Sequence, residues 1–354
     1  MDFFYITRDE ELKQAALEWN EEKVLGIDLE CENNLHHYGV YISLVQISSK
    51  DKHWIVDILQ IENHQPLIKM FHDTEIEKIF HDFSFDLRVI AHQWDCHPKN
   101  IFDTQLAALF LGKAELGLGS LLEEYFQIKK EGKFQKADWT ERPISMEMLS
   151  YATKDAKYLI PLQDKLVEEL RKKERLTWLK EELAYLEKKG FTYKQGDFLD
   201  LRGASILSGK ERSILKCLFE IRESLAKKVD RPSYFVMNNR KLLSLAQDPP
   251  NSLESWKRIH GVHPIVKQDA TEFFQAVKEA SKVELKIPSP EHKKMTGLQK
   301  KQVHELNLQA EALAAKYQIK KHLLLSKDQI RDIVLTGSYG SLRDWQRKLL
   351  KNHK

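Results

Sequence analysis

The first sixty residues alternate between apolar and polar positions with the two-residue period that is typical of β-strands. Four such segments, rich in β-branched side chains, lie at residues 3–6, 24–30, 41–47 and 53–56. Their short connections predict a meander. A further strand is expected over residues 78–81, and a helix follows it over residues 84–94.

From residue 104 onward the apolar positions follow the period of a helix. Strands first, with helices between and after them, predict an α/β domain over residues 1–190. Residues 191–206 lose clear periodicity and contain Gly196 and Gly203, which predicts a linker. The remaining chain is helical in pattern, and a break with two prolines at residues 286–292 divides it.

We therefore expect a helical domain over residues 207–285 and a second helical domain over residues 286–354, the latter packed back toward the first domain. Within the first domain, one long helix is expected from Met146 to about residue 175. Pro161 lies inside that helix and is expected to bend it, because proline has no amide hydrogen to donate.

Composition narrows the class of protein. A chain of 354 residues that is 42% hydrophobic can bury at least one large core. Its start lacks the pattern of a signal peptide and no segment reaches the length of a membrane span, so a cytoplasmic protein with no membrane partner is expected. The 56 basic and 53 acidic residues nearly cancel, so the net charge says little about partners.

The cysteines are few and scattered. Cys31, Cys96 and Cys217 form neither a disulfide framework nor a CxxC zinc motif. The simplest interpretation is three buried small apolar side chains in a reducing compartment, with no disulfide-linked partner.

The candidate chemistry begins with Asp28 and Glu30, two acids at positions i and i+2 of a strongly apolar strand. The period of two places both carboxylates on one face of the sheet. Two neighbouring anions repel each other and lose hydration, so a positive charge has to compensate them. Solvated acids at an exposed strand end are the alternative.

Two further motifs follow on helices. Asp86 lies in the first turns of the helix after the strand at 78–81, where an acid can also simply favour the helix N-terminus. Tyr151 and Asp155 are four residues apart and so project from one helical face. Each motif is common by itself. Their order, D-x-E, then Asp after a strand-to-helix turn, then Y-x-x-x-D, is specific.

In this order the residues resemble the DEDD exonuclease superfamily, and the surrounding sequence resembles the ribonuclease D family. The similar stretches within residues 20–165 include G-I-D-L-E, F-H-D-F-S-F-D-L, D-T-Q-L-A, K-A-D-W-T-E-R-P-I and Y-A-T-K-D-A-K-Y-L. Tyr151 indicates the tyrosine subclass, because Ser150 occupies the place where the sister subclass has a histidine. The D-L-E form of the first motif is as similar to the eukaryotic nuclear-exosome relatives as to the bacterial enzymes.

The resemblance implies an α/β, ribonuclease H-like mixed-sheet exonuclease domain followed by all-α HRDC-type helical domains. It implies that Asp28, Glu30, Asp86 and Asp155 bind two divalent metal ions, and that Tyr151 holds the attacking water. Carboxylates alone are hard oxygen ligands, which favours Mg²⁺ or Mn²⁺ over zinc. The expected activity is 3′→5′ exoribonuclease hydrolysis that releases 5′-mononucleotides.

Residues 207–285 resemble the HRDC domain, an auxiliary nucleic-acid-binding module, in stretches such as L-F-E-I-R-E-S-L-A-K-K-V-D-R-P-S-Y-F-V. Its expected phosphate contacts are Lys227, Lys228, Arg231, Arg240 and Lys241. A second basic group, at Lys129, Lys130, Lys133 and Lys136, precedes Trp139 and is expected to track phosphates near the site. For any single lysine, a solvated helix surface is the simpler interpretation.

The expected partners are RNAs with free 3′ ends, namely tRNA precursors and other small structured RNAs, as the resemblance implies. Two alternatives stay open: a single-stranded DNA 3′→5′ exonuclease with the same acids, and a non-catalytic RNA-binding protein. Among nearby residues, His81 is expected to be a structural histidine at a strand end. Asp103 is expected to be the N-cap of the helix that follows it.

Overall fold

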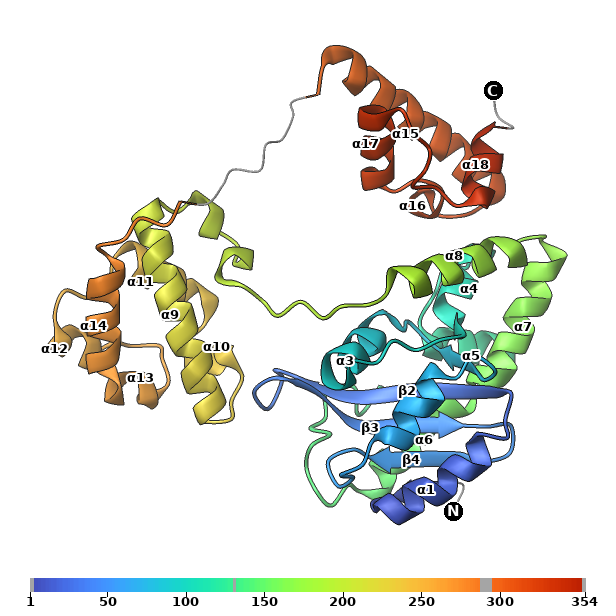
Figure 1. Cartoon of the computed structure of the whole chain (residues 1–354), viewed down its shortest axis with the longest axis horizontal. Helices are drawn as coiled ribbons and strands as arrows, with labels where there is room; N and C mark the ends of the chain where they lie inside the picture. The colour runs from blue at the N-terminus through green and yellow to red at the C-terminus, as the bar shows by residue number, and fades with distance from the viewer. Residues whose placement is uncertain (1–2, 130–131, 287–294, 352–354) are drawn as a thin grey trace. The chain divides into compact units, whose positions relative to one another are not determined.

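The computed structural model describes residues 3–129, 132–286 and 295–351, and its contacts divide the chain into two compact units (Figure 1). Unit 1 contains the described residues of 1–30, 42–193 and 293–354, and unit 2 those of 31–41 and 194–292. This division differs from the three bodies expected from the sequence, because the C-terminal helices group with the α/β part.

Unit 1 is built on one six-stranded sheet. Its strands are β1 (Phe4–Ile6), β2 (Val24–Asn33), β3 (Val40–Ser48), β4 (His53–Asp57), β5 (Glu77–Phe80) and β6 (Ile101–Asp103), in the spatial order β1-β4-β3-β2-β5-β6. β3 and β4 pair antiparallel, whereas β1 with β4, β2 with β5, and β5 with β6 pair in parallel. The sheet is therefore mixed, as predicted. β1 is not part of a meander, since α1 (Asp9–Trp19) separates it from β2 and it joins the far side of β4.

Seven more helices accompany the sheet: α2 (Gln65–His72), α3 (Ser84–Trp94), α4 (Thr104–Leu111), α5 (Leu118–Phe126), α6 (Met146–Lys157), α7 (Leu159–Lys172) and α8 (Leu176–Lys189). Helix α6 packs on β4, α7 on β5 and α4, and α8 on β6 and α4. The core is formed by the central strands, where side chains such as Leu25, Ile27 and Ile55 are fully buried. Each such side chain stabilises the fold by about 1.5–3 kcal/mol.

The helix expected from Met146 to about residue 175 is in fact two helices, which meet at Tyr158. Pro161 is the reason. Its ring would clash with the carbonyl of Lys157, four residues earlier, and it cannot donate a hydrogen bond to that carbonyl. The chain therefore ends α6 at Lys157 and restarts as α7 rather than bending within one helix.

The C-terminal helices α15 (Gly297–Tyr317), α16 (Lys321–Leu324), α17 (Lys327–Thr336) and α18 (Asp344–Lys351) belong to unit 1. Helix α18 packs on α8, where Trp345 stacks on Trp178 with ring centroids 5.1 Å apart. Trp345 also meets the edge of Phe110 on α4 at 5.4 Å, and Arg343 forms an ion pair with Glu182 on α8. The prediction that the last block packs back toward the first domain is confirmed.

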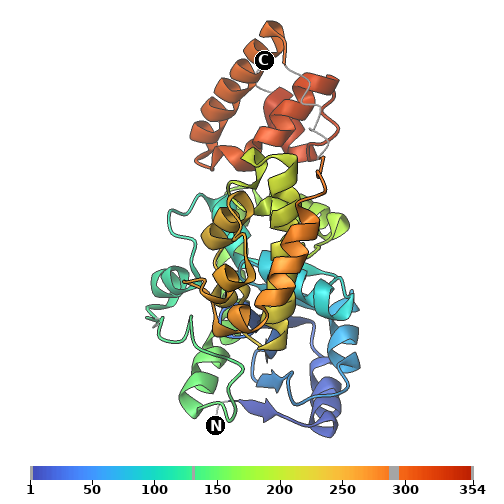
Figure 2. The same cartoon turned by 90° about the vertical axis from the view of Figure 1, so that its left-hand side faces the viewer.

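Unit 2 is helical, as predicted, with α9 (Gly209–Lys228), α10 (Ser233–Val236), α11 (Asn239–Gln247), α12 (Leu253–Lys257), α13 (Pro264–Gln268) and α14 (Ala270–Ala280). Helices α9 and α14 lie side by side (Figures 1 and 2). Trp256 stacks on Phe273 in the centre of the core at 5.3 Å. Residues 287–292 of the predicted second break lie outside the described residues.

Unit 2 also includes residues that the sequence predicted to belong to the linker or to the first domain. Phe198 and Ala204, in the predicted linker, are buried in its core, so the stretch without helix or strand shortens to residues 191–197. The tip of the β2–β3 hairpin, Cys31–Tyr41, groups with unit 2 as well. There Asp230 accepts hydrogen bonds from the backbone N–H of Tyr38 at 3.2 Å and pairs with His37 Nδ1 at 2.6 Å.

The cysteines differ in burial. Of the three cysteines, Cys96 is buried as expected, but Cys31 and Cys217 are half-buried, and no disulfide joins them within the described residues. None of the described helices is long and apolar enough to cross a membrane.

Candidate active site

The first two acids lie on β2, which is flanked by β3 and β5 in the middle of the sheet. Asp28 and Glu30 are half-exposed, while Leu25, Ile27 and Leu29 around them are buried. The strand alternation thus places both carboxylates on one face, as the i, i+2 spacing predicted. The buried neighbours hold the strand rigidly in the sheet, so the two acids are fixed in position.

Asp155 joins them from α6. Carboxylate oxygens of Asp28, Glu30 and Asp155 all lie within 4.8 Å of one another, and Asp155 is only 5% exposed. Gly26 explains how the helix comes so close. A Cβ at that position would lie 2.6 Å from the carbonyl oxygen of Ala156, so only glycine lets the end of α6 pack directly on β2.

Asp86 is not a member of that group of three carboxylates among the described residues. It lies in the first turn of α3, and burial together with the nearby charges of Asp82 and Asp103 raises its pKa to about 8. An acid with so high a pKa is one that a cation would return to its charged form.

Asp103 does more than the sequence suggested. It caps α4 as predicted, accepting a hydrogen bond from the N–H of Leu106 at 2.7 Å. Its second oxygen accepts from the N–H of Phe83 at 2.8 Å, which ties the start of α3, and so Asp86, to the end of β6. Burial raises the pKa of Asp103 to about 6 although both of these hydrogen bonds lower it.

His81 lies at the end of β5, where its ring forms a hydrogen bond of the kind expected for a structural histidine. Its Nδ1 lies 2.9 Å from the hydroxyl of Thr104, and that hydroxyl donates to the carbonyl of Phe80 at 3.0 Å. The ring therefore links the end of β5 to the start of α4.

Tyr151 lies one helical turn before Asp155 on α6, in a cluster of three rings. Its ring centroid is 5.5 Å from that of Phe134 and 6.3 Å from that of Trp139. A cavity of about 270 Å³ opens beside it. Three cations and one further aromatic residue contribute to its wall, namely Lys129, Lys133, Lys154 and Tyr158. Lys130 of the predicted basic group lies outside the described residues.

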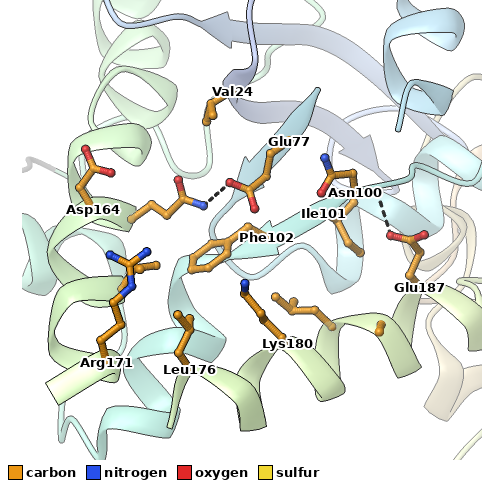
Figure 3. A pocket seen from close by; sticks show the side chains of 14 residues that line it. Val24, Glu77, Asn100, Ile101, Phe102, Asp164, Arg171, Leu176, Lys180 and Glu187 are labelled. Atoms are coloured by element: carbon orange, nitrogen blue, oxygen red, sulfur yellow. Dashed lines mark hydrogen bonds between the residues drawn. The ribbon is translucent and has the colours of Figure 1, made fainter. Parts of the chain in front are cut away.

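A different cavity, of about 570 Å³, lies where the parallel strands β2, β5 and β6 begin, away from Asp28 and Glu30 (Figure 3). Val24, Glu77 and Ile101, the first residues of β2, β5 and β6, line it. Its polar wall includes Gln163, whose Nε2 donates to Glu77 at 2.6 Å. Because Asp28 and Glu30 lie further along β2, this cavity is separate from the group of carboxylates.

Residues 3–171 match the family model described as 3′-5′ exonuclease, and residues 211–277 match the HRDC domain model. The first match contains the five candidate residues, and the second lies within unit 2.

Similar proteins cover most or nearly all of the chain. Ribonuclease D of Pseudomonas paraeruginosa is 27% identical and spans 97% of this chain and 94% of its own length. Exosome complex exonuclease RRP6 of Saccharomyces cerevisiae is 25% identical over 78% of this chain, which corresponds to 40% of the yeast protein.

Solved structures show the same fold. Escherichia coli RNase D superposes over 100% of both chains with a TM-score of 0.78 at 23% identity. The catalytic core of RRP6 from Trypanosoma brucei covers 78% of this chain with a TM-score of 0.69 at 26% identity. Residues 3–171 therefore form a domain of the 3′→5′ exonuclease family, residues 211–277 form an HRDC domain, and the chain is similar in sequence to ribonuclease D over nearly its whole length.

Proposed function

We propose that this chain is a metal-dependent enzyme that removes 5′-mononucleotides one at a time from RNA 3′ ends, with Asp28, Glu30, Asp86, Tyr151 and Asp155 as its catalytic residues. The observation that carries the proposal is the convergence of three carboxylates within 4.8 Å, next to Tyr151, inside the domain that matches the exonuclease model. We further propose tRNA precursors and other small structured RNAs in the cytoplasm as the substrates.

The donor set fits two hard divalent cations, Mg²⁺ or Mn²⁺. Asp28, Glu30 and Asp155 would hold them with Asp86, and all four offer only carboxylate oxygens. The raised pKa of Asp86 points the same way, because its charged form needs a compensating cation. When bound, such cations lower the pKa of a water molecule and stabilise the charge that develops on a phosphate during in-line displacement.

We assign to Tyr151 the role of orienting the water molecule that attacks the phosphate. Its hydroxyl lies on the same helix as Asp155, one turn earlier, and its ring is held by Phe134 and Trp139. A hydroxyl in a fixed position orients an attacking water by a hydrogen bond, and orientation of this kind lowers the barrier because the entropy of alignment is lost before the reaction.

Contacts to the nucleic acid are assigned to two basic surfaces. In unit 1, Lys129, Lys133 and Lys154 line the cavity beside Tyr151, where lysines suit phosphates and aromatic rings suit bases. In unit 2, Arg231 lies three residues before Tyr234 in the chain, and Tyr234 and Phe235 are 54% and 57% exposed. Exposed aromatic residues among lysines and arginines are typical of surfaces that bind single strands.

The test is hydrolysis of a 3′-labelled or 5′-labelled RNA strand and of the single-stranded DNA of the same sequence, with and without EDTA. We expect stepwise 3′→5′ shortening of RNA that requires Mg²⁺ or Mn²⁺ and releases 5′-mononucleotides. Asp28→Asn should abolish it, whereas Asp164→Asn, an exposed acid on α7, should leave it unchanged. Faster hydrolysis of DNA than of RNA would favour the DNA exonuclease, and binding without hydrolysis would favour a scaffold.

A further inference from the structure

An ion pair between a buried carboxylate and a half-buried arginine connects the segment that carries Trp139 to the sheet. Asp57, the last residue of β4, is fully buried. Arg142 donates Nε and Nη2 to its two carboxylate oxygens at 2.6 and 2.7 Å, the forked geometry that arginine makes with carboxylates. Through Nη1 the same guanidinium donates to the backbone carbonyl of Trp139 at 2.7 Å. One side chain thus joins β4 to Trp139.

The carboxylate of Asp57 is held firmly by its other partners. It accepts from the hydroxyl of Tyr5 at 2.5 Å, from Nε2 of Gln60 at 2.8 Å and from the N–H of Leu59 at 3.2 Å. Ser43 completes the arrangement, because its hydroxyl accepts from Arg142 at 3.1 Å and donates to the same Trp139 carbonyl. Asp57 is therefore a fixed anchor on the sheet.

Stability alone does not account for such a pair. Removing the charge of a buried carboxylate such as Asp57 from water costs several kcal/mol, and ion pairs with a buried member are often matched in stability by apolar side chains of similar volume. What the pair supplies is a defined geometry, because Arg142 forms the fork with Asp57 and the bond to Trp139 at the same time.

The position of Trp139 affects Tyr151, because the two side chains pack against each other. Trp139 is 5% exposed and belongs to the apolar cluster of Leu44, Ile55 and Ile144, against which Tyr151 packs. The planes of the Trp139 and Tyr151 rings are inclined by 32°, with centroids 6.3 Å apart. Since protein interiors are close-packed, a shift of the Trp139 backbone displaces both rings.

We infer that the Asp57–Arg142 ion pair positions Tyr151 through Trp139, so that both members of the pair are positioning residues for hydrolysis. The inference rests on the proposed function. The sequence analysis did not predict this pair, because the D-W-T-E-R-P stretch served there only for the family resemblance and Asp57 belongs to no motif.

The test is a double-mutant cycle that combines Arg142→Lys with Tyr151→Phe, measured under single-turnover conditions on a short RNA strand with saturating Mg²⁺. Lysine keeps the positive charge but cannot form the fork and the carbonyl bond together. We expect Arg142→Lys to lower the hydrolysis rate about tenfold without changing RNA affinity, a size typical of coupling between packed neighbours. In the Tyr151→Phe background the same substitution should cost less than about twofold.

The matched control is Arg175→Lys. Arg175 is a buried arginine of the same unit that donates to the backbone carbonyls of Phe110 and Tyr317. It should leave the rate unchanged in both backgrounds. If Arg142→Lys slows hydrolysis equally in both backgrounds, or weakens RNA binding instead of hydrolysis, the pair does not act through Tyr151 and the inference is wrong.

A second measurement does not depend on activity. The chain has 11 tyrosines, which can be replaced by 3-fluorotyrosine, and Tyr151→Phe identifies the fluorine resonance of Tyr151. Arg142→Lys should shift that resonance, and Arg175→Lys should not. An unmoved resonance overturns the inference even if the enzyme is active, and a shifted one supports it even if no RNA is hydrolysed. If Arg142→Lys does not fold, Trp139→Phe takes its place in both measurements, with the same expectations.

Discussion

Replacing Trp345 by alanine tests how the C-terminal helices hold unit 1 together. Trp345 is 1% exposed, stacks on Trp178 with the ring planes inclined by 14°, and meets the edge of Phe110. Truncating a buried tryptophan to alanine costs about 3–5 kcal/mol, since it removes both apolar burial and packing contacts. That is a large part of the roughly 5–15 kcal/mol by which a domain is stable.

For a unit of this size, each kcal/mol lowers the melting temperature by about 2–4 °C, so a loss of about 6–20 °C is expected. The assay is calorimetry together with the temperature at which hydrolysis of a short RNA strand is lost. The matched control is Trp256→Ala, which removes an equally buried and stacked tryptophan from the core of unit 2. We expect Trp345→Ala to lower the inactivation temperature, and Trp256→Ala to lower a separate transition while short-strand hydrolysis persists.

The reasoning is refuted if Trp345→Ala leaves the inactivation temperature unchanged, because α18 would then contribute nothing to the stability of the catalytic part. It is also refuted if the two variants lower that temperature equally, because the two units would then unfold together. A chain that ends at Gly190 would lack Trp345, so it would expose the apolar rings of Trp178 and Phe110 that Trp345 covers. Point substitutions therefore test the C-terminal helices better than such a truncation does.

Three further outcomes follow from the site and the charges. Tyr151→Phe should lower turnover by about 10²- to 10⁴-fold while Mn²⁺ binding, followed by calorimetry, is retained; unchanged turnover with chemistry rate-limiting would remove the tyrosine from the mechanism. Without metal ions, in EDTA, the pKa of Asp86 is about 8 in the folded protein, which is above its value in the unfolded chain. Between these two pKa values the folded protein binds one more proton than the unfolded chain, so the free energy of unfolding falls as the pH rises toward 8. Asp86→Asn should therefore stabilise the metal-free protein more at pH 9 than at pH 5, and an equal melting-temperature difference at both would contradict this. Replacing Lys227, Lys228 and Arg231 by alanine should make the salt dependence of binding to a tRNA-like substrate shallower by up to about one log–log unit per contact, and an unchanged slope would exclude unit 2 from RNA binding.

Much of the local structure and the identity of the candidate residues could be inferred from the sequence by itself. The period of two along β2 determined that Asp28 and Glu30 share a face, and the i, i+4 spacing did the same for Tyr151 and Asp155 on α6. Asp103 at the start of α4 was recognisable as an N-cap because the capping bond spans only three residues. These features depend on neighbours in the chain, which is why residue patterns report them.

Only the tertiary structure decided which distant segments meet. It paired β1 in parallel with β4, grouped residues 31–41 with unit 2, and placed α18 on α8. It brought Asp155 to β2 through the close approach that Gly26 allows, and it joined Arg142 to Asp57 across 85 positions of the chain. Such contacts depend on shape complementarity and on burial summed over several elements, and no periodicity in one segment records what the partner segment will be.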